Sequence, residues 1–170
     1  MFIHALVTFI VSLACGLTGA AQHAHHQEGP TASTSALGAD QVRQLLEGEG
    51  MGLAKPAELN HYPGPRHVLE LRTELGITPD QERQVAAVRE EMLVRARALG
   101  RRIVEAEQAL DAAFRSGEIT EAELARQVGM IARLQGELRL AHLRAHVLTR
   151  PLLTVEQVRR YYELRRGHGH

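Results

Sequence analysis

Apolar residues recur at helical spacing along most of the chain, and the longest run lies in its middle. From 79 to 115 they return every three or four residues over several heptads, which predicts a long helix with a narrow apolar stripe. The run from 121 to 148 has the same spacing, with Val128 and Leu148 on its expected inner side. Because only a short link separates the two runs, they are expected to form an antiparallel hairpin.

Shorter helices are expected on both sides of this hairpin. The pattern predicts helices at 40–47, 65–75 and 154–166. Residues 48–64 contain too much glycine and proline for a continuous helix and are interpreted as a turn-rich strap. No strand pattern of useful length appears, so the predicted class is all-α.

Three helix starts carry the residues of a capping box. In Thr78–Gln81 and Thr154–Gln157, threonine can accept a bond from the first turn while glutamine reaches back to the threonine amide. Thr120 and Glu123 form a third candidate box at the start of the second long helix. The first two starts bracket the hairpin, and each joins a short helix to it.

The first 21 residues are almost wholly apolar and small, which is typical of a secretory signal peptide. An uncleaved anchor helix and a lipoprotein attached at Cys15 are the alternatives. Residues 22–39, with His23, His25 and His26, are expected to form a flexible tether, 40–64 the first short helix and strap, and 167–170 a tail. The 20 basic and 20 acidic residues leave no net charge, which argues against a nucleic-acid partner.

An export signal and two Leu-Thr-x-x-Gln motifs around a helical hairpin resemble the Spy/CpxP superfamily of periplasmic stress proteins. The motifs are 77–81, with Ile77 in place of leucine, and 153–157, and the resemblance covers about 65–166. It implies a periplasmic four-helix hooked hairpin, often a homodimer with a concave face, and no catalytic activity. Members of the family either bind metal, as in its heavy-metal resistance and metal-sensor branch, or act as ATP-independent chaperones. The expected partners are a second copy, unfolded envelope proteins or a membrane sensor protein.

A candidate metal site follows from two histidines one helical turn apart. His142 and His146 project from one side of their helix at the edge of its apolar stripe, a spacing that can chelate Zn, Cu, Ni or Co. The hairpin geometry places Glu91 opposite them, and His67 with Glu70 folds back toward the same end. The alternative is that both histidines satisfy backbone or carboxylate groups at a helix interface.

Client binding is the second functional hypothesis, and it depends on apolar and basic residues exposed on one concave face. The basic candidates are Arg95, Arg97, Arg101 and Arg102, although arginine at helical spacing is also typical of a solvated face. An enzyme is not expected, because the sequence contains no catalytic triad, phosphate-binding glycine loop or carboxylate pair in a credible pocket.

Overall fold

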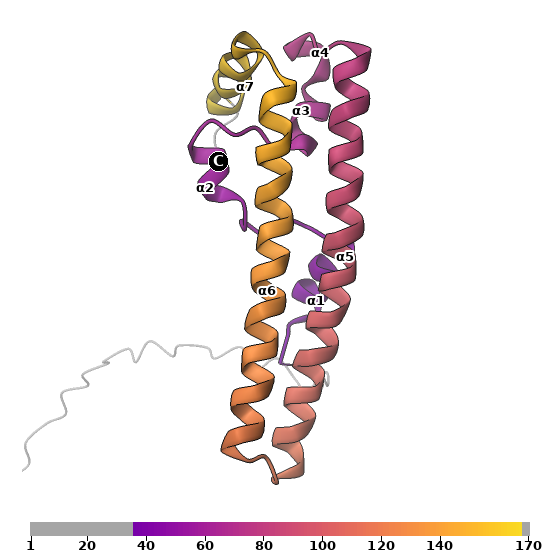
Figure 1. Cartoon of the computed structure of the whole chain (residues 1–170), viewed down its shortest axis with the longest axis vertical. Helices are drawn as coiled ribbons and strands as arrows, with labels where there is room; N and C mark the ends of the chain where they lie inside the picture. The colour runs from indigo at the N-terminus through magenta and orange to yellow at the C-terminus, as the bar shows by residue number, and fades with distance from the viewer. Residues whose placement is uncertain (1–35, 168–170) are drawn as a thin grey trace, which may run out of the picture. The chain divides into compact units, whose positions relative to one another are not determined.

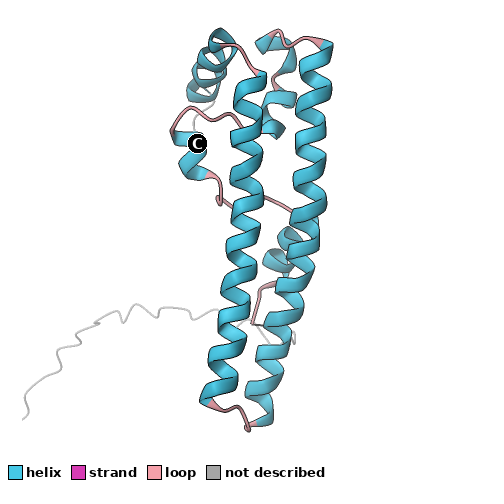
Figure 2. Ribbon diagram, viewed as in Figure 1, coloured by secondary structure: helices cyan, strands magenta, loops and turns pink. Residues whose placement is uncertain are grey.

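The computed structural model describes residues 36–167, which belong to one unit, Ala32–His170. Helices make up 81% of the described residues, and no strand occurs among them, so the all-α prediction is confirmed (Figure 2). None of the described helices is long and apolar enough to cross a membrane. The predicted signal peptide, most of the tether and the last three tail residues lie outside the described part of the chain.

Two long helices, α5 (Pro79–Ser116) and α6 (Glu121–Thr149), pack against each other along their length (Figure 1). Only residues 117–120 separate them, so the helices are antiparallel, as predicted. Their shared core contains buried residues from both helices, among them Ala96, Leu99, Ile103, Ile131, Leu134 and Leu138. Burial of these side chains is the main force that holds the hairpin together.

Helix α1 (Ala39–Glu47) packs on α5 and adds Leu45 to the same core. The close approach depends on Gly100, because a Cβ at that position would collide with the Leu45 carbonyl oxygen. The strap that follows contains a five-residue helix, α2 (Lys55–Leu59), which the sequence reading did not expect. Helix α2 contacts α6 (Figure 1), and Gly48 at the start of the strap lies against Ala96 and Arg97 of α5.

The predicted helix 65–75 is wrong as one continuous element. It is broken at Leu71 into α3 (Pro65–Glu70) and α4 (Arg72–Leu75). After the 3₁₀ turn η1 (Arg150–Leu152), α7 (Val155–Gly167) closes the described chain. These elements share a second core with the start of α5, formed by Val68, Leu75, Val85, Leu153, Val158 and Tyr161.

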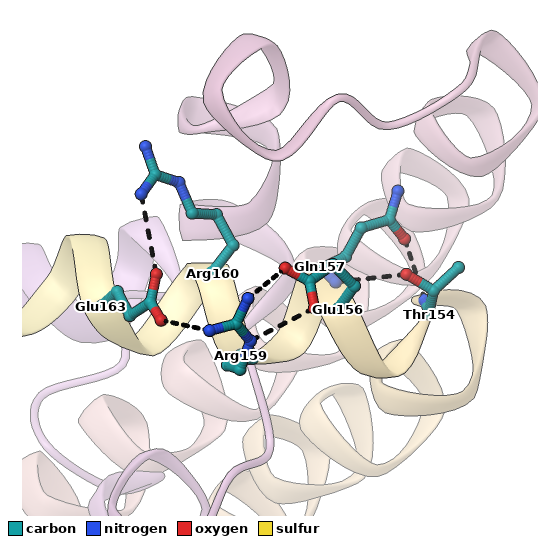
Figure 3. A network of polar contacts seen from close by, with 6 residues as sticks. All are labelled: Thr154, Glu156, Gln157, Arg159, Arg160 and Glu163. Carbon is teal, nitrogen blue, oxygen red and sulfur yellow. Dashed lines mark hydrogen bonds and ion pairs between the residues drawn. The ribbon is translucent and has the colours of Figure 1, made fainter.

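Both predicted threonine–glutamine capping boxes are present. Thr78 and Gln81 exchange two bonds at the start of α5, and Thr154 and Gln157 do the same before α7 (Figure 3). The glutamines also bind each other, since Gln81 Nε2 lies 2.9 Å from Gln157 Oε1 and Gln157 Nε2 lies 3.1 Å from Gln81 Oε1. The two helix starts are therefore fastened together, a contact that the sequence pattern alone did not reveal.

The third predicted box is only half formed. Thr120 Oγ1 accepts a bond from the Glu123 amide, but the Glu123 carboxylate bonds to Arg126 and Gln127 instead of returning to Thr120. A charge-assisted hydrogen bond from a guanidinium to a carboxylate is stronger than one from a neutral amide. This explains why Glu123 binds Arg126 rather than the Thr120 amide. Helix α6 thus begins with a single side-chain cap.

Candidate functional site

A cavity of about 520 Å³ lies between the strap, the start of α3 and the facing sides of α5 and α6. The strap contributes Gly50, Met51 and Gly64 to its wall, and α3 contributes His67. The remaining wall comes from the two long helices and includes Met92 and Leu93 of α5 and His142, Ala145 and His146 of α6. Three of the five predicted site residues therefore line one cavity.

His146 is held in a defined orientation by the strap. Its side chain is only 7% exposed, and Nδ1 lies 2.7 Å from the carbonyl oxygen of Tyr62. A carbonyl oxygen can only accept a hydrogen bond, so Nδ1 of His146 must carry the proton. In the neutral ring this leaves Nε2 with a free lone pair.

His142 lies one turn earlier and is even more deeply buried, at 5% exposure. Its Nε2 has no hydrogen-bond partner among the described residues, which is rare for a buried nitrogen. Burial lowers the pKa of His142, and the neighbouring His146 lowers it further. The His142 ring is therefore favoured in its neutral form, which is the form that binds metal.

His67 of α3 lines the same cavity and is half-buried. Its Nδ1 lies 3.4 Å from the Tyr161 hydroxyl of α7. Burial is the main cause that lowers the pKa of His67, the positive charge of Arg165 adds to it, and the carboxylates of Glu70 and Glu58 oppose it. Burial also raises the pKa of Tyr161 to about 12, so this hydroxyl keeps its proton at neutral pH.

The two predicted carboxylates do not line this cavity. Glu70 pairs with Arg66 at 2.8 Å, and its side chain is 52% exposed. Glu91 lies in a shallow groove between α5 and α6, 4.0 Å from Arg144 and 71% exposed. Across residues 36–167 no three His, Cys, Asp or Glu side chains are grouped in a way that could hold a metal ion.

Several residues of the wall were missed by sequence reasoning. Glu58 of α2 is half-buried there, and its charge acts on the pKa of His67. Gly64 lies so close to α6 that an added Cβ would be 2.8 Å from His146 Cε1. The glycine and proline content of the strap was a visible signal, but nothing in the sequence showed that the strap covers the histidines.

The burial of both α6 histidines corrects a second expectation. They were placed at the edge of the apolar stripe, with Val128 and Leu148 on its inner side. Instead His142 and His146 are buried, whereas Val128 is 48% and Leu148 38% exposed. The other buried residues of the predicted inner side are Ile131, Leu134, Leu138, Ala141 and Ala145, as expected. The strap lies against His142 and His146, which explains why these two side chains are also buried.

Comparison with known proteins adds no family to these observations. No family model, curated protein or solved structure matches the chain. The wall of the cavity brings the imidazoles of His67, His142 and His146 together with methionine and glutamate side chains.

Proposed function

We propose that the chain is an exported, non-enzymatic metal-binding protein of envelope stress or heavy-metal response. The paired caps, the hairpin and the apolar start of the chain support a place in the Spy/CpxP superfamily, with its four-helix hooked hairpin and periplasmic location. The metal ligands that we propose are His142 and His146 of α6 with His67 of α3. They would hold a divalent transition metal such as Zn, Cu, Ni or Co.

The observation that carries this proposal is the hydrogen bond between His146 Nδ1 and the Tyr62 carbonyl oxygen. Histidines that bind metal commonly donate their second ring N–H to a backbone carbonyl, which fixes the tautomer and aims the other nitrogen. His146 has this arrangement, and the unpartnered Nε2 of His142 lies one turn away.

Metal binding requires side chains of the cavity wall to turn toward one ion. A zinc ion usually takes four ligands in a tetrahedral site. His67, Glu58 and Met92 line the same cavity, and in this proposal rotation about their side-chain bonds would bring further donors to the α6 pair. Glu70 and Glu91 are engaged with arginines and are less suited to this role, although both were named by the sequence pattern.

The test is a metal titration of metal-free full-length protein by isothermal calorimetry with Zn²⁺ and Ni²⁺. His23, His25, His26, His168 and His170 are replaced by serine in all samples, so that these residues cannot contribute. We expect one ion per chain and a large loss of affinity in the His142→Ala, His146→Ala double variant. His61→Ala is the matched control, because His61 is exposed and does not line the cavity. Equal affinity in all three proteins would contradict the proposed site.

Client binding stays a second candidate because apolar side chains are exposed on the hairpin. Leu140 and Leu148 of α6 line the shallow groove with Val88 and Met92 of α5, and Leu140 is 57% exposed. Arg95, one of the predicted basic residues, lines the same groove. Exposed apolar patches of this kind are typical of protein contact surfaces. Suppression of client aggregation in the presence of a metal chelator would favour this activity.

A further inference from the structure

The cavity beside the histidines is larger than a metal ion needs. Its volume of about 520 Å³ falls in the range of pockets that bind small organic molecules. Part of its wall is apolar, with Met51 of the strap, Met92 and Leu93 of α5 and Ala145 of α6. A ligand with an apolar body would contact these side chains there.

Among the arginine and lysine residues of this wall, Arg89 is the half-buried one and lacks a counter-charge within residues 36–167. Lys55 and Arg97 have no ion pair there either, but both are exposed. Arg89 of α5 is half-buried, and its guanidinium has no ion pair or hydrogen bond to any residue of the described part. Other arginines of the wall are engaged, since Arg66 binds Glu70 and Arg97 donates to the Glu47 carbonyl oxygen. Withdrawing a charge from water without a partner costs free energy. A bound carboxylate would supply the partner through two parallel hydrogen bonds to the guanidinium.

Three carboxylates belong to this wall, those of Glu47, Glu49 and Glu58. Glu47 and Glu49 are paired with Arg43, whereas the Glu58 carboxylate acts on the pKa of His67 and of Tyr161 and therefore lies toward α3 and α7. Arg89 belongs to α5, and His142 of α6 offers a buried ring nitrogen that has no protein partner within residues 36–167. A bound anion would therefore find both a cation and a second polar group in the same wall.

We propose that this cavity binds a small amphipathic carboxylate, with its carboxylate on Arg89 and its apolar body against Met51, Met92 and Leu93. The inference goes beyond metal binding and does not depend on it, because Arg89, Met51 and Leu93 are not among the donors proposed for the metal ion. His142 faces both ligands, so metal and carboxylate are expected to compete.

The experiment uses decanoate as the probe and the full-length protein in a metal chelator. Binding is measured by isothermal calorimetry, with decan-1-ol and decylamine as neutral and cationic probes of the same chain length. We expect one decanoate per chain and weaker binding of both other probes. Arg89→Gln should weaken decanoate binding by about tenfold or more, since a charge-assisted bond is lost.

Three further variants make the outcome decisive. Arg101→Gln is the matched control, because Arg101 lies on the same helix but is exposed and outside the cavity wall. Arg89→Lys keeps the charge and should retain part of the affinity, and Leu140→Ser tests for adsorption to the groove. The proposal would be overturned if the three probes bound equally well. It would also be overturned if Arg89→Gln and Arg101→Gln lost the same decanoate affinity, or if only Leu140→Ser lost decanoate affinity. Because Arg89→Gln leaves the histidines in place, its zinc affinity should be unchanged, which separates this proposal from the metal site.

Discussion

His142 and His146 occupy equivalent positions one turn apart on α6, yet their rings are held differently. The Tyr62 carbonyl oxygen fixes the tautomer of His146, whereas the Nε2 of His142 is buried without a protein partner in the described part. Their spacing was readable from the sequence, but their burial was not, because it depends on strap residues about 80 to 90 positions earlier. At the residue scale, the site is thus created by a long-range contact.

The lowered pKa values of His142 and His67 predict that stability depends on pH. The unfolded state binds protons near the ordinary pKa of 6.5, and the folded state binds them only at lower pH. The free energy of unfolding should therefore be highest above about pH 7 and fall as the pH drops below 6.5. Urea unfolding from about pH 8 to about pH 5 measures this. His142→Gln should reduce the slope, and an unchanged slope would contradict the assignment.

Gly64→Ala tests whether the strap holds His146 in place. The added methyl group would lie 2.8 Å from His146 Cε1, so the ring or the strap must shift. We expect a loss of about 1–3 kcal/mol in the free energy of unfolding and weaker zinc binding. The control is Gly136→Ala in α6, which meets no atom within 4 Å and should be neutral or stabilising. Identical unfolding curves for the two variants would show that Gly64 does not support the ring.

At the element scale, hydrophobic periodicity located the helices well. The predicted segments 79–115 and 121–148 differ from α5 and α6 by one residue at their ends. The break at Leu71 and the short helix α2 were missed, since elements of four to six residues depend on their tertiary contacts more than on local pattern. The same limit applies to the burial of His142 and His146, which depends on strap residues that the local pattern of α6 does not include.

The bond between the two capping glutamines predicts an energetic coupling between distant helix starts. Gln81→Ala and Gln157→Ala each remove one partner of the two side-chain hydrogen bonds between these glutamines. A double-mutant cycle of urea unfolding should give a coupling energy of about 0.5–1.5 kcal/mol. Thr120→Ala with Gln81→Ala is the comparison, because their side chains share no bond, and this pair should be additive. If the changes in unfolding free energy of the two glutamine variants were additive, the hydrogen bonds between Gln81 and Gln157 would add nothing to stability.

At the scale of the whole molecule, the sequence predicted the helical class and the hairpin, but only part of the site. It named His142 and His146 through their helical spacing and His67 through the expected return of its helix to the same end of the hairpin. Glu70 was named from its spacing with His67 and Glu91 from the hairpin geometry. Both lie beside arginines instead, Arg66 one turn away from Glu70 and Arg144 across the hairpin from Glu91. The cavity itself could not be foreseen, since it exists only where the strap, α3 and the two long helices meet.

We propose that the exposed groove of the hairpin supports self-association, in line with the homodimer expected from the family resemblance. Leu140→Glu would place a charge in the groove beside Glu91 and should shift a dimer toward monomer in analytical ultracentrifugation. Val155→Glu is the control, because Val155 is 79% exposed on α7 and lies outside this groove. Equal sedimentation of both variants and the parent protein would exclude the groove as the dimer contact.

The most direct test of the central claim is long-range ¹H–¹⁵N NMR of the histidine rings, in full-length protein whose tail histidines are replaced. Without metal, His146 should be the Nδ1-protonated tautomer, because Tyr62 accepts that proton. One equivalent of Zn²⁺ should shift the Nε2 signals of His142 and His146 while Nδ1 of His146 stays protonated. An Nε2-protonated His146, or ring signals that do not respond to zinc, would contradict the proposed metal site.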